Sequence, residues 1–210
     1  MVRLTHVVLA AVIAIGASAA PADAAPSKRL PAELGALWTT VLQAPAATNP
    51  FTGGDPCIVL GGHVISPFAG GAEFTCTVRP GTWLLVVGWS SECSTVEDAP
   101  YHGDDEMSLR TCARSVDAGL QTPTVTLDGR PIRVTEVETA LLDFVLPAGH
   151  IFDPALPAGT AGQSVGHGWV VLLHPLPPGS HVIHIENEGM YMGQPFESVN
   201  TTTIEVVPRS

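Results

Sequence analysis

The sequence has little positive charge. Of its 210 residues only 9 are lysine or arginine, against 20 aspartates and glutamates, and Lys28 is the single lysine. The formal net charge is -11 at pH 7. Binding to nucleic acid or to an anionic membrane surface needs clustered basic side chains, so this composition argues against both kinds of partner.

Long apolar runs are also missing. The most apolar segment is Val7–Ala17, which is shorter than the roughly 18 apolar residues that suggest a membrane-spanning helix. Arg3 precedes this segment, and two small-residue cleavage sites follow it, the second ending at Ala24. This layout is typical of a secretory signal peptide. We therefore expect residues 1–24 to be a signal peptide and residues 25–210 to form a single secreted domain.

Cysteine is scarce, with four in the chain. Export would place them in an oxidising compartment, where disulfides persist. Four cysteines allow three pairings. We expect neighbours to pair in order, Cys57 with Cys76 and Cys93 with Cys112, because each pair brackets one local unit. A zinc site is the rival interpretation, but the spacing contains no C-x-x-C.

Strand patterns dominate what is present. Glu73–Val78 alternates between apolar and polar residues, which predicts a half-buried strand. Trp83–Val87 is a continuous apolar run, typical of a strand covered on both faces. The pair Asp128-Gly129 suits a tight turn between two antiparallel strands. The strands expected around and after that turn are Val125–Leu127, Ile132–Val137, Leu141–Leu146, Trp169–Leu173, His181–Glu186 and Thr202–Val207.

An N-terminal helix is expected ahead of the strands. Pro31 suits a first helical position. The apolar residues between Leu34 and Leu42 then fall on one helical face, and Ala44-Pro45 ends the pattern. This face should pack against the sheet.

A second, short helix is predicted over about Asp104 to Val116. Acidic residues begin this segment and arginines come later, which matches the helix dipole. Leu109 and Val116 share its apolar face, and Gly119 is the expected C-cap. The order of elements predicts an all-β fold, a β-sandwich of Ig-like or jelly-roll type with an N-terminal helix and one short inserted helix.

Several short segments carry a family resemblance. They are Trp38 in a helix, Asn49-Pro50 with Cys57, Cys76–Gly81, Glu92–Thr95, Leu109–Ala113, Leu127–Gly129 and Gly168–Val170. Together they resemble a family of secreted, actinomycete-type bacterial proteins with a signal peptide and paired cysteines. The segment Gly54–Pro56, which directly precedes Cys57, departs from that pattern. The resemblance implies export and a β-rich fold, and it implies no catalytic residues because no activity is established for the family.

Gly162–Gly166 matches the G-x-S-x-G pattern of α/β-hydrolases, with Ser164 at the nucleophile position. That motif needs a strand before the serine and a helix after it. Here a Pro/Gly-rich segment precedes the serine, and no acidic residue lies between Ser164 and the last histidine, His184. We therefore interpret the segment as a flexible glycine-rich loop and expect no catalytic serine.

His150, Asp153 and His167 lie in one Gly/Pro-rich stretch. Histidine and aspartate bind metals and transfer protons, and loops often carry function. These residues support an alternative function, a hydrolase or metal-dependent enzyme with its site in this loop. They lack a known ligand spacing, so polar surface is the expectation we favour.

An acidic segment precedes the second helix. Its oxygens could hold Ca²⁺, but the spacing of a calcium-binding loop is missing. Favourable charge at the helix N-terminus explains the segment without an ion. The residues concerned are Glu97, Asp98, His102, Asp104, Asp105 and Glu106.

No motif in the sequence combines a nucleophile, a base and an orienting group. We therefore expect a non-catalytic exported protein, extracellular or envelope-associated, with a binding or structural role. An extracellular protein or a glycan is the expected type of partner. No cofactor or metal is expected.

Overall fold

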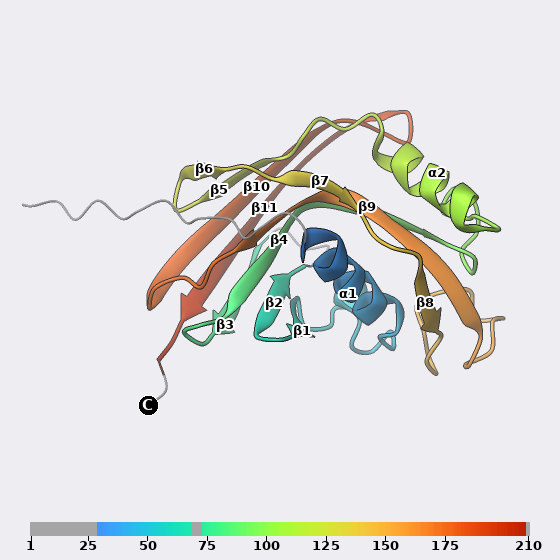
Figure 1. The fold of residues 1–210 in the computed structure, drawn as a ribbon, viewed down its shortest axis with the longest axis horizontal. Coiled ribbons are helices and arrows are strands. Elements are labelled where there is room, and N and C mark those ends of the chain that lie inside the picture. Colours follow the sequence, from blue (N-terminus) through green and yellow to red (C-terminus); the bar gives the residue numbers. More distant parts are fainter. Residues whose placement is uncertain (1–28, 69–72, 209–210) are drawn as a thin grey trace, which may run out of the picture.

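The strands, some with alternating and some with continuous apolar residues, pair into two sheets that face each other. The computed structural model describes residues 29–68 and 73–208. The prediction of an all-β sandwich with two helices is confirmed (Figure 1). The signal peptide expected at residues 1–24 lies outside the described residues.

One sheet, which we call the helix-covered sheet, has six strands. They are β1 (Cys57–Gly61), β2 (Val64–Pro67), β4 (Trp83–Ser94), β7 (Thr135–Glu138), β8 (Leu142–Val145) and β9 (Ala161–Leu173). The order is β1-β2-β4-β9-β7, and β8 also pairs with β9. The pairing of β2 with β4 is parallel.

The other sheet, which we call the outer sheet, has five strands. They are β3 (Glu73–Val78), β5 (Thr124–Leu127), β6 (Arg130–Ile132), β10 (Gly179–Tyr191) and β11 (Gln194–Val206). The order is β3-β11-β10-β5-β6. β3 pairs with β11 in parallel and forms one edge of the sheet.

Strand β4 supplies side chains to two separate cores. Leu84 and Val86 pack between the sheets, whereas Leu85 and Val87 face the first helix. Successive side chains of a strand point to opposite faces, so a continuous apolar run can fill both layers. The prediction that this strand is covered on both faces is confirmed.

The first helix, α1 (Leu30–Leu42), covers the helix-covered sheet and lies beneath the arch of its long strands in Figure 1. Its buried stripe packs on Leu85 and Val87 of β4. Trp38 Nε1 donates a hydrogen bond to Ser90 Oγ at 2.9 Å, so the indole is satisfied where it is buried. The predicted helix and its apolar face are confirmed. A short 3-10 helix over Pro50–Thr52 follows it.

The second helix, α2 (Glu106–Asp117), begins at a capping box. Asp105 accepts a hydrogen bond from the Ser108 backbone N–H, and Ser108 Oγ accepts one from the Asp105 N–H. The predicted face is confirmed, since Leu109 and Val116 are buried. The expected glycine cap is wrong: the C-cap is Ala118. Gly119 has another role, because a Cβ there would lie 2.4 Å from the Met190 carbonyl oxygen.

The turn at Asp128-Gly129 is confirmed, with φ angles of 51° and 74° in the left-handed region. The single strand expected over Ile132–Val137 is wrong. Its first residues end β6 in the outer sheet, and β7 then pairs with β9 in the helix-covered sheet. One segment thus crosses between the sheets: Ile132 and Val134 pack on the core between the sheets, whereas Val137 packs on the core under α1.

Four strands are longer than their apolar patterns predict: β4, β9, β10 and β11 each span 12 or 13 residues. β9 begins at Ala161, so Gly162–Gly166 is strand and the expected flexible loop is wrong. Glycine and serine are poor strand formers, but pairing with β4 and β8 on either side overrides that preference.

Both predicted disulfides are confirmed. Cys57–Cys76 joins β1 to β3, and Cys93–Cys112 joins β4 to α2, with Cα–Cα distances of 5.6 and 6.1 Å. Each bridge links two elements that share no strand pairing. Among the described helices, none has the length and hydrophobicity to cross a membrane.

Candidate functional site

The structure does not bring His150, Asp153 and His167 together. His150 Nε2 lies 3.0 Å from the Leu156 carbonyl oxygen, and Asp153 accepts a hydrogen bond from the Ala155 N–H, so both stabilise their own loop. His167 instead lies within β9. Among the described residues, no group of three or more histidine, cysteine or acidic side chains is arranged to hold a metal ion. The structure therefore does not assemble a site from these three residues.

His167 is the centre of a different, buried polar network. Its Nδ1 lies 3.0 Å from Asp117 Oδ2 at the end of α2, and its Nε2 lies 3.2 Å from Glu136 Oε1 on β7. Ser91 Oγ lies 2.9 Å from the same Asp117 oxygen. Burial acts to lower the pKa of His167, but the hydrogen bond and charge of Asp117, with Glu136, raise it overall. Both ring nitrogens face carboxylates, which is the arrangement that an imidazolium satisfies.

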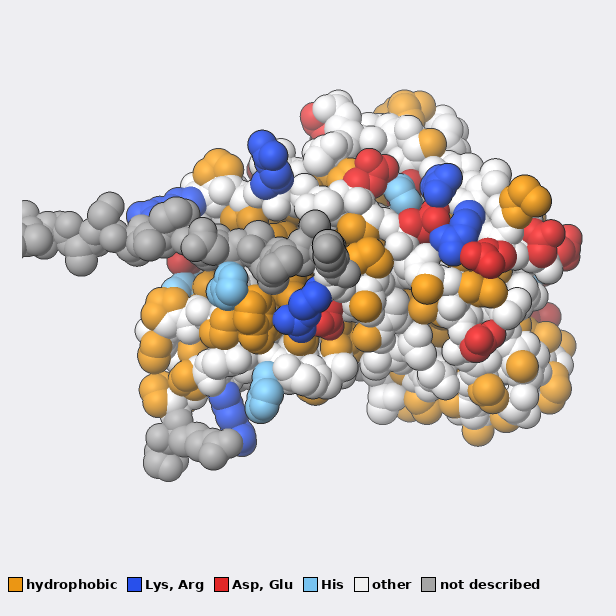
Figure 2. Space-filling model, in the orientation of Figure 1, with side chains coloured by type: hydrophobic (Ala, Val, Ile, Leu, Met, Phe, Trp, Pro, Cys, Tyr) orange, Lys and Arg blue, Asp and Glu red, His pale blue; other side chains and the backbone are white. Residues whose placement is uncertain are grey.

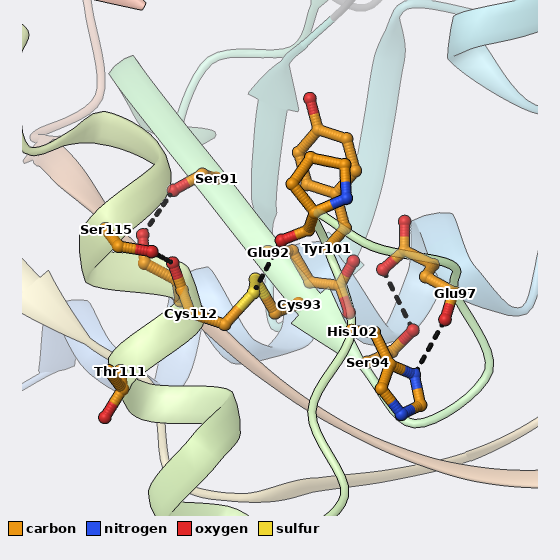
Figure 3. The surroundings of a disulfide bond; sticks show 12 residues. Ser91, Glu92, Cys93, Ser94, Glu97, Tyr101, His102, Thr111, Cys112 and Ser115 are labelled. Carbon is orange, nitrogen blue, oxygen red and sulfur yellow. Dashed lines mark hydrogen bonds between the residues drawn. A yellow bond between two sulfur atoms is a disulfide. The ribbon is translucent and has the colours of Figure 1, made fainter. Parts of the chain in front are cut away.

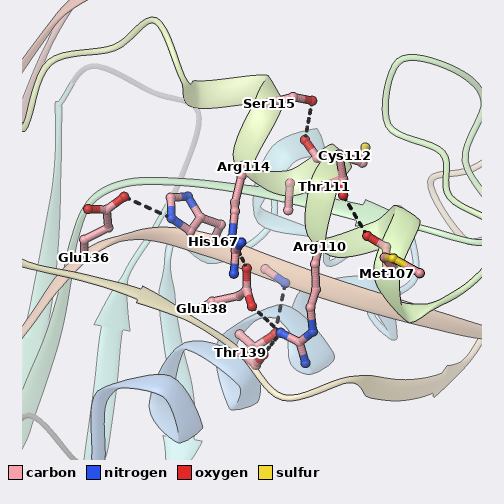
Figure 4. A network of polar contacts seen from close by, with 12 residues as sticks. Met107, Arg110, Thr111, Cys112, Arg114, Ser115, Glu136, Glu138, Thr139 and His167 are labelled. Atoms are coloured by element: carbon pink, nitrogen blue, oxygen red, sulfur yellow. Dashed lines mark hydrogen bonds and ion pairs between the residues drawn. The ribbon is translucent and has the colours of Figure 1, made fainter.

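A second set of ion pairs fastens α2 to the strand that carries Glu136. Glu138 on β7 accepts from Arg110 and from Arg114 Nε, the latter at 2.7 Å, and Arg110 also reaches the Thr139 carbonyl oxygen at 3.1 Å (Figure 4). These contacts join α2 to the edge of the helix-covered sheet. Their geometry indicates attachment rather than chemistry.

Ser164 is buried and held, contrary to the expectation of a flexible loop. Its hydroxyl donates a hydrogen bond to Glu92 Oε1 on the paired strand β4. Ser94 and Ser164 are partners in the same ladder. A carboxyl group thus holds the Ser164 hydroxyl, which the Pro/Gly-rich sequence before it does not indicate.

Glu92 is buried and interacts with a second, partly buried carboxyl group, that of Glu97. Its partner Glu97 follows β4 and accepts a hydrogen bond from Ser94 Oγ at 2.9 Å, as Figure 3 shows. Burial raises the pKa of Glu92 well above its usual value, and the neighbouring charge of Glu97 raises it further against the effect of the Ser164 hydrogen bond. Burial also raises the pKa of Glu97. The charge of Glu97 thus opposes the ionisation of Glu92, in the same direction as burial.

The residue types in this cluster are those of an acid–base site, but a substrate cannot reach them. A catalytic serine or acid must reach a substrate, whereas Ser164 is 0% exposed and Glu92 6%. His102 contacts the Glu97 carbonyl oxygen through Nδ1 rather than either carboxyl group. The cluster therefore holds the end of β4 to β9 and to the loop that follows β4.

The acidic segment before α2 is explained by local contacts. Asp105 caps the helix, Glu106 pairs with Arg110, and His102 Nε2 lies 3.0 Å from Asp104. The hydrogen bond with Asp104 raises the pKa of His102. The helix-terminus interpretation of the segment thus has direct support in the capping geometry.

An open groove lies at the edge of the sandwich, between β2 and β3. Its volume is about 630 Å³, within the range of ligand-binding clefts. We call it the edge groove. Apolar side chains of three strands form its walls, and a histidine and an arginine come from the adjoining turns. The main contributors are Val59, Ile65, Thr77, Val78, His63 and Arg79.

The lining of the edge groove contains no acidic residue in the described part of the chain, although the protein has 20 of them. A hollow on α2, of about 380 Å³, differs in this respect. Two of its lining side chains, Glu106 and Arg110, already pair with each other. Figure 2 shows the wider contrast: on this face, acidic side chains concentrate around α2, and the opposite end has fewer.

Neither the residues of the buried polar clusters nor those of the edge groove are predicted by the sequence. Glu92 and Asp117 carry a weak signal, an acidic residue beside a cysteine or at a helix end near buried strands. His63 and Arg79 carry none, because each is an exposed residue in a turn. Only the approach of the two turns brings them to one groove.

Comparisons with known proteins give no relative of established function. No family model and no curated protein matches the chain. Among solved structures it is similar to a cysteine protease inhibitor from Entamoeba histolytica, with 10% identity over 69% of this chain and 95% of that chain, at a TM-score of 0.28. Similarity at this level does not relate the two proteins in function.

Proposed function

We propose that this chain is an exported, non-catalytic binding module whose ligand site is the edge groove. The main support for this proposal is that a strongly acidic protein has an apolar groove without acidic side chains at an open edge of the sandwich. Apolar clefts with a few placed polar groups are the usual form of small-ligand sites.

The polar clusters support this function because their side chains already contact one another. Ser164 is satisfied by Glu92, and His167 is held between Asp117 and Glu136. Both Ser164 and His167 are also buried, so neither side chain is open to a substrate. Two disulfides are consistent with an exported protein, and they stabilise the fold where a binding module must keep its shape.

The proposal is tested with 1-anilinonaphthalene-8-sulfonate, an apolar anion whose fluorescence rises in apolar sites. Val59 is 68% exposed on the groove wall, so Val59→Glu should leave folding intact and remove most of the dye fluorescence. Val199, 56% exposed on β11 and outside the groove lining, provides the matched control Val199→Glu, which should retain it.

Thermal melts of the three proteins establish that each is folded at the temperature of the dye titration. A wild-type protein that gives no fluorescence rise would contradict the proposal. So would equal losses in both variants, because they would show that the dye does not distinguish the groove from the sheet surface.

A further inference from the structure

The edge groove has two chemically different ends. At one end, two turns meet: the Trp83 N–H donates to the His63 carbonyl oxygen at 2.8 Å, and the Thr82 N–H donates to the Arg79 carbonyl oxygen at 3.2 Å. The first contact places the β1–β2 turn beside the β3–β4 turn, and the second closes the β3–β4 turn itself. His63 and Arg79 therefore stand at the same end, which we call the cationic end.

The walls that lead away from the cationic end are apolar. Val59 and Ile65 are cross-strand partners in β1 and β2, and Val78 lies on β3 across the groove. Val78 packs in the core between the sheets and is 4% exposed, so this part of the wall is already desolvated. An apolar chain placed here would bury more surface at about 25 cal/mol per Å².

The disulfide Cys57–Cys76 crosses the end opposite Arg79. Cys57 begins β1, at the far end of that strand from the turn with His63, and Cys76 is three residues before Arg79. The bridge joins the edge strands of the two sheets, so it fixes their separation along the groove. From Cys57 to Gly61 the strand extends about 13 Å, at roughly 3.3 Å per residue, which limits the length of a ligand.

Arg79 is available to a ligand. The arginine ion pairs found among the described residues involve Arg29, Arg110 and Arg114. Arg79 is exposed at the groove rim, and its guanidinium has the fork geometry that pairs with a carboxylate. An acid-free lining removes competing anions from the site.

From this arrangement we propose that the edge groove binds a single-chain amphipathic carboxylate of medium length. The carboxylate pairs with Arg79 beside His63, and the acyl chain lies against Val59, Ile65 and Val78. This assignment rests on the proposed function, since it names the ligand of the same groove.

The test uses three amphiphiles with the same ten-carbon chain: decanoate, decanol and decyltrimethylammonium. Each is titrated by calorimetry, below its micelle concentration and at pH 7, into the full oxidised protein. Decanoate should bind at least about tenfold more tightly than the other two. Methyl NMR shifts should move at Val59, Ile65 and Val78 in the decanoate titration.

Substitutions then separate the head group from the chain. Arg79→Ala should weaken decanoate binding about tenfold or more. Arg133→Ala removes another exposed arginine, one outside the groove lining, and should leave the affinity unchanged. Decanol binding should be the same in both variants.

Two results would overturn the ligand assignment alone. Decanol binding as tightly as decanoate, with no effect of Arg79→Ala, would leave a binding groove without a carboxylate site. Groove methyl shifts that follow protein concentration instead of decanoate would mean that a second copy of the chain occupies the groove. Failure of the dye and all three amphiphiles to bind would overturn the proposed function as well.

Discussion

At the scale of single residues, buried polar side chains form pairs between residues that are far apart in the sequence. Glu92 and Ser164 are 72 positions apart, and Asp117 and His167 are 50 apart. Each pair lies where an unpaired polar group would cost free energy. Their contribution is to hold β4, β9 and α2 in one arrangement.

Ser164 should not react as a nucleophile. Its hydroxyl is buried and already donates to Glu92, and among the described residues no histidine accepts its proton. We expect serine-directed fluorophosphonate probes to leave the folded protein unlabelled. Stoichiometric labelling that Ser164→Ala abolishes, detected by intact-protein mass spectrometry, would contradict the non-catalytic function.

Glu92→Gln should make the protein less sensitive to rising pH. The pKa of Glu92 is raised in the folded state, so its contribution to stability is complete below its unfolded pKa and is lost as pH rises through the folded value. Glutamine cannot ionise, so the variant should have the higher urea midpoint at pH 8. Each unit of pKa shift corresponds to about 1.4 kcal/mol.

Ser180→Ala, a change at an exposed strand residue, is a suitable control for that measurement. It should reproduce the wild-type dependence of the midpoint between pH 5 and pH 8. If Glu92→Gln follows the same curve as wild type, the carboxyl pair is not titrating in the folded protein.

At the scale of elements, α2 is attached to the sandwich in three ways. An apolar face centred on Leu109 packs on Val165, a disulfide joins Cys112 to Cys93, and Arg110 pairs with Glu138. These contacts reach β9, β4 and β7 respectively. Removing one of these contacts should therefore weaken the attachment of α2 to the sandwich without detaching the helix.

Leu109→Ala should lower the free energy of unfolding by about 2–5 kcal/mol, because the side chain is 0% exposed and its loss leaves a cavity. Met107→Ala on the same helix is the matched control. Met107 is 75% exposed, so the change should stay within about 0.5 kcal/mol. Denaturant titration of both variants measures the difference. Equal effects would mean that the buried face of α2 has been assigned wrongly.

At the scale of the whole molecule, several titrating groups give stability the same dependence on pH. The pKa values of Glu92, Glu97, His167 and His181 are all raised in the folded state. For each, the stability present at low pH is lost as pH rises through its folded pKa. A net charge of -11 adds self-repulsion at neutral pH and above.

We therefore expect a higher unfolding midpoint at pH 5 than at pH 8.5, in urea at constant ionic strength. Asp105 and Asp128 limit this trend at the acidic end, because their pKa values are lowered and their contributions are lost as pH falls. A midpoint that rises steadily from pH 5 to pH 8.5 would be the opposite of the expected result.

The sequence by itself determined the elements whose residues interact locally. The apolar stripe of α1, the alternation of Glu73–Val78 and the turn at Asp128-Gly129 each follow from a period or a backbone preference. The acidic start of α2 and the pairing of neighbouring cysteines also depend on short separations. A local signal suffices where the interacting residues are close in the chain.

Only the tertiary structure decided which distant segments meet. The glycine- and serine-rich start of β9 is a strand because β4 and β8 pair with it, and no local preference predicts this. Long-range contacts form only when the whole chain packs, so their energy is absent from any short window of sequence. His63 and Arg79 come to one groove for that reason: two sheets, a disulfide and two turns place them together.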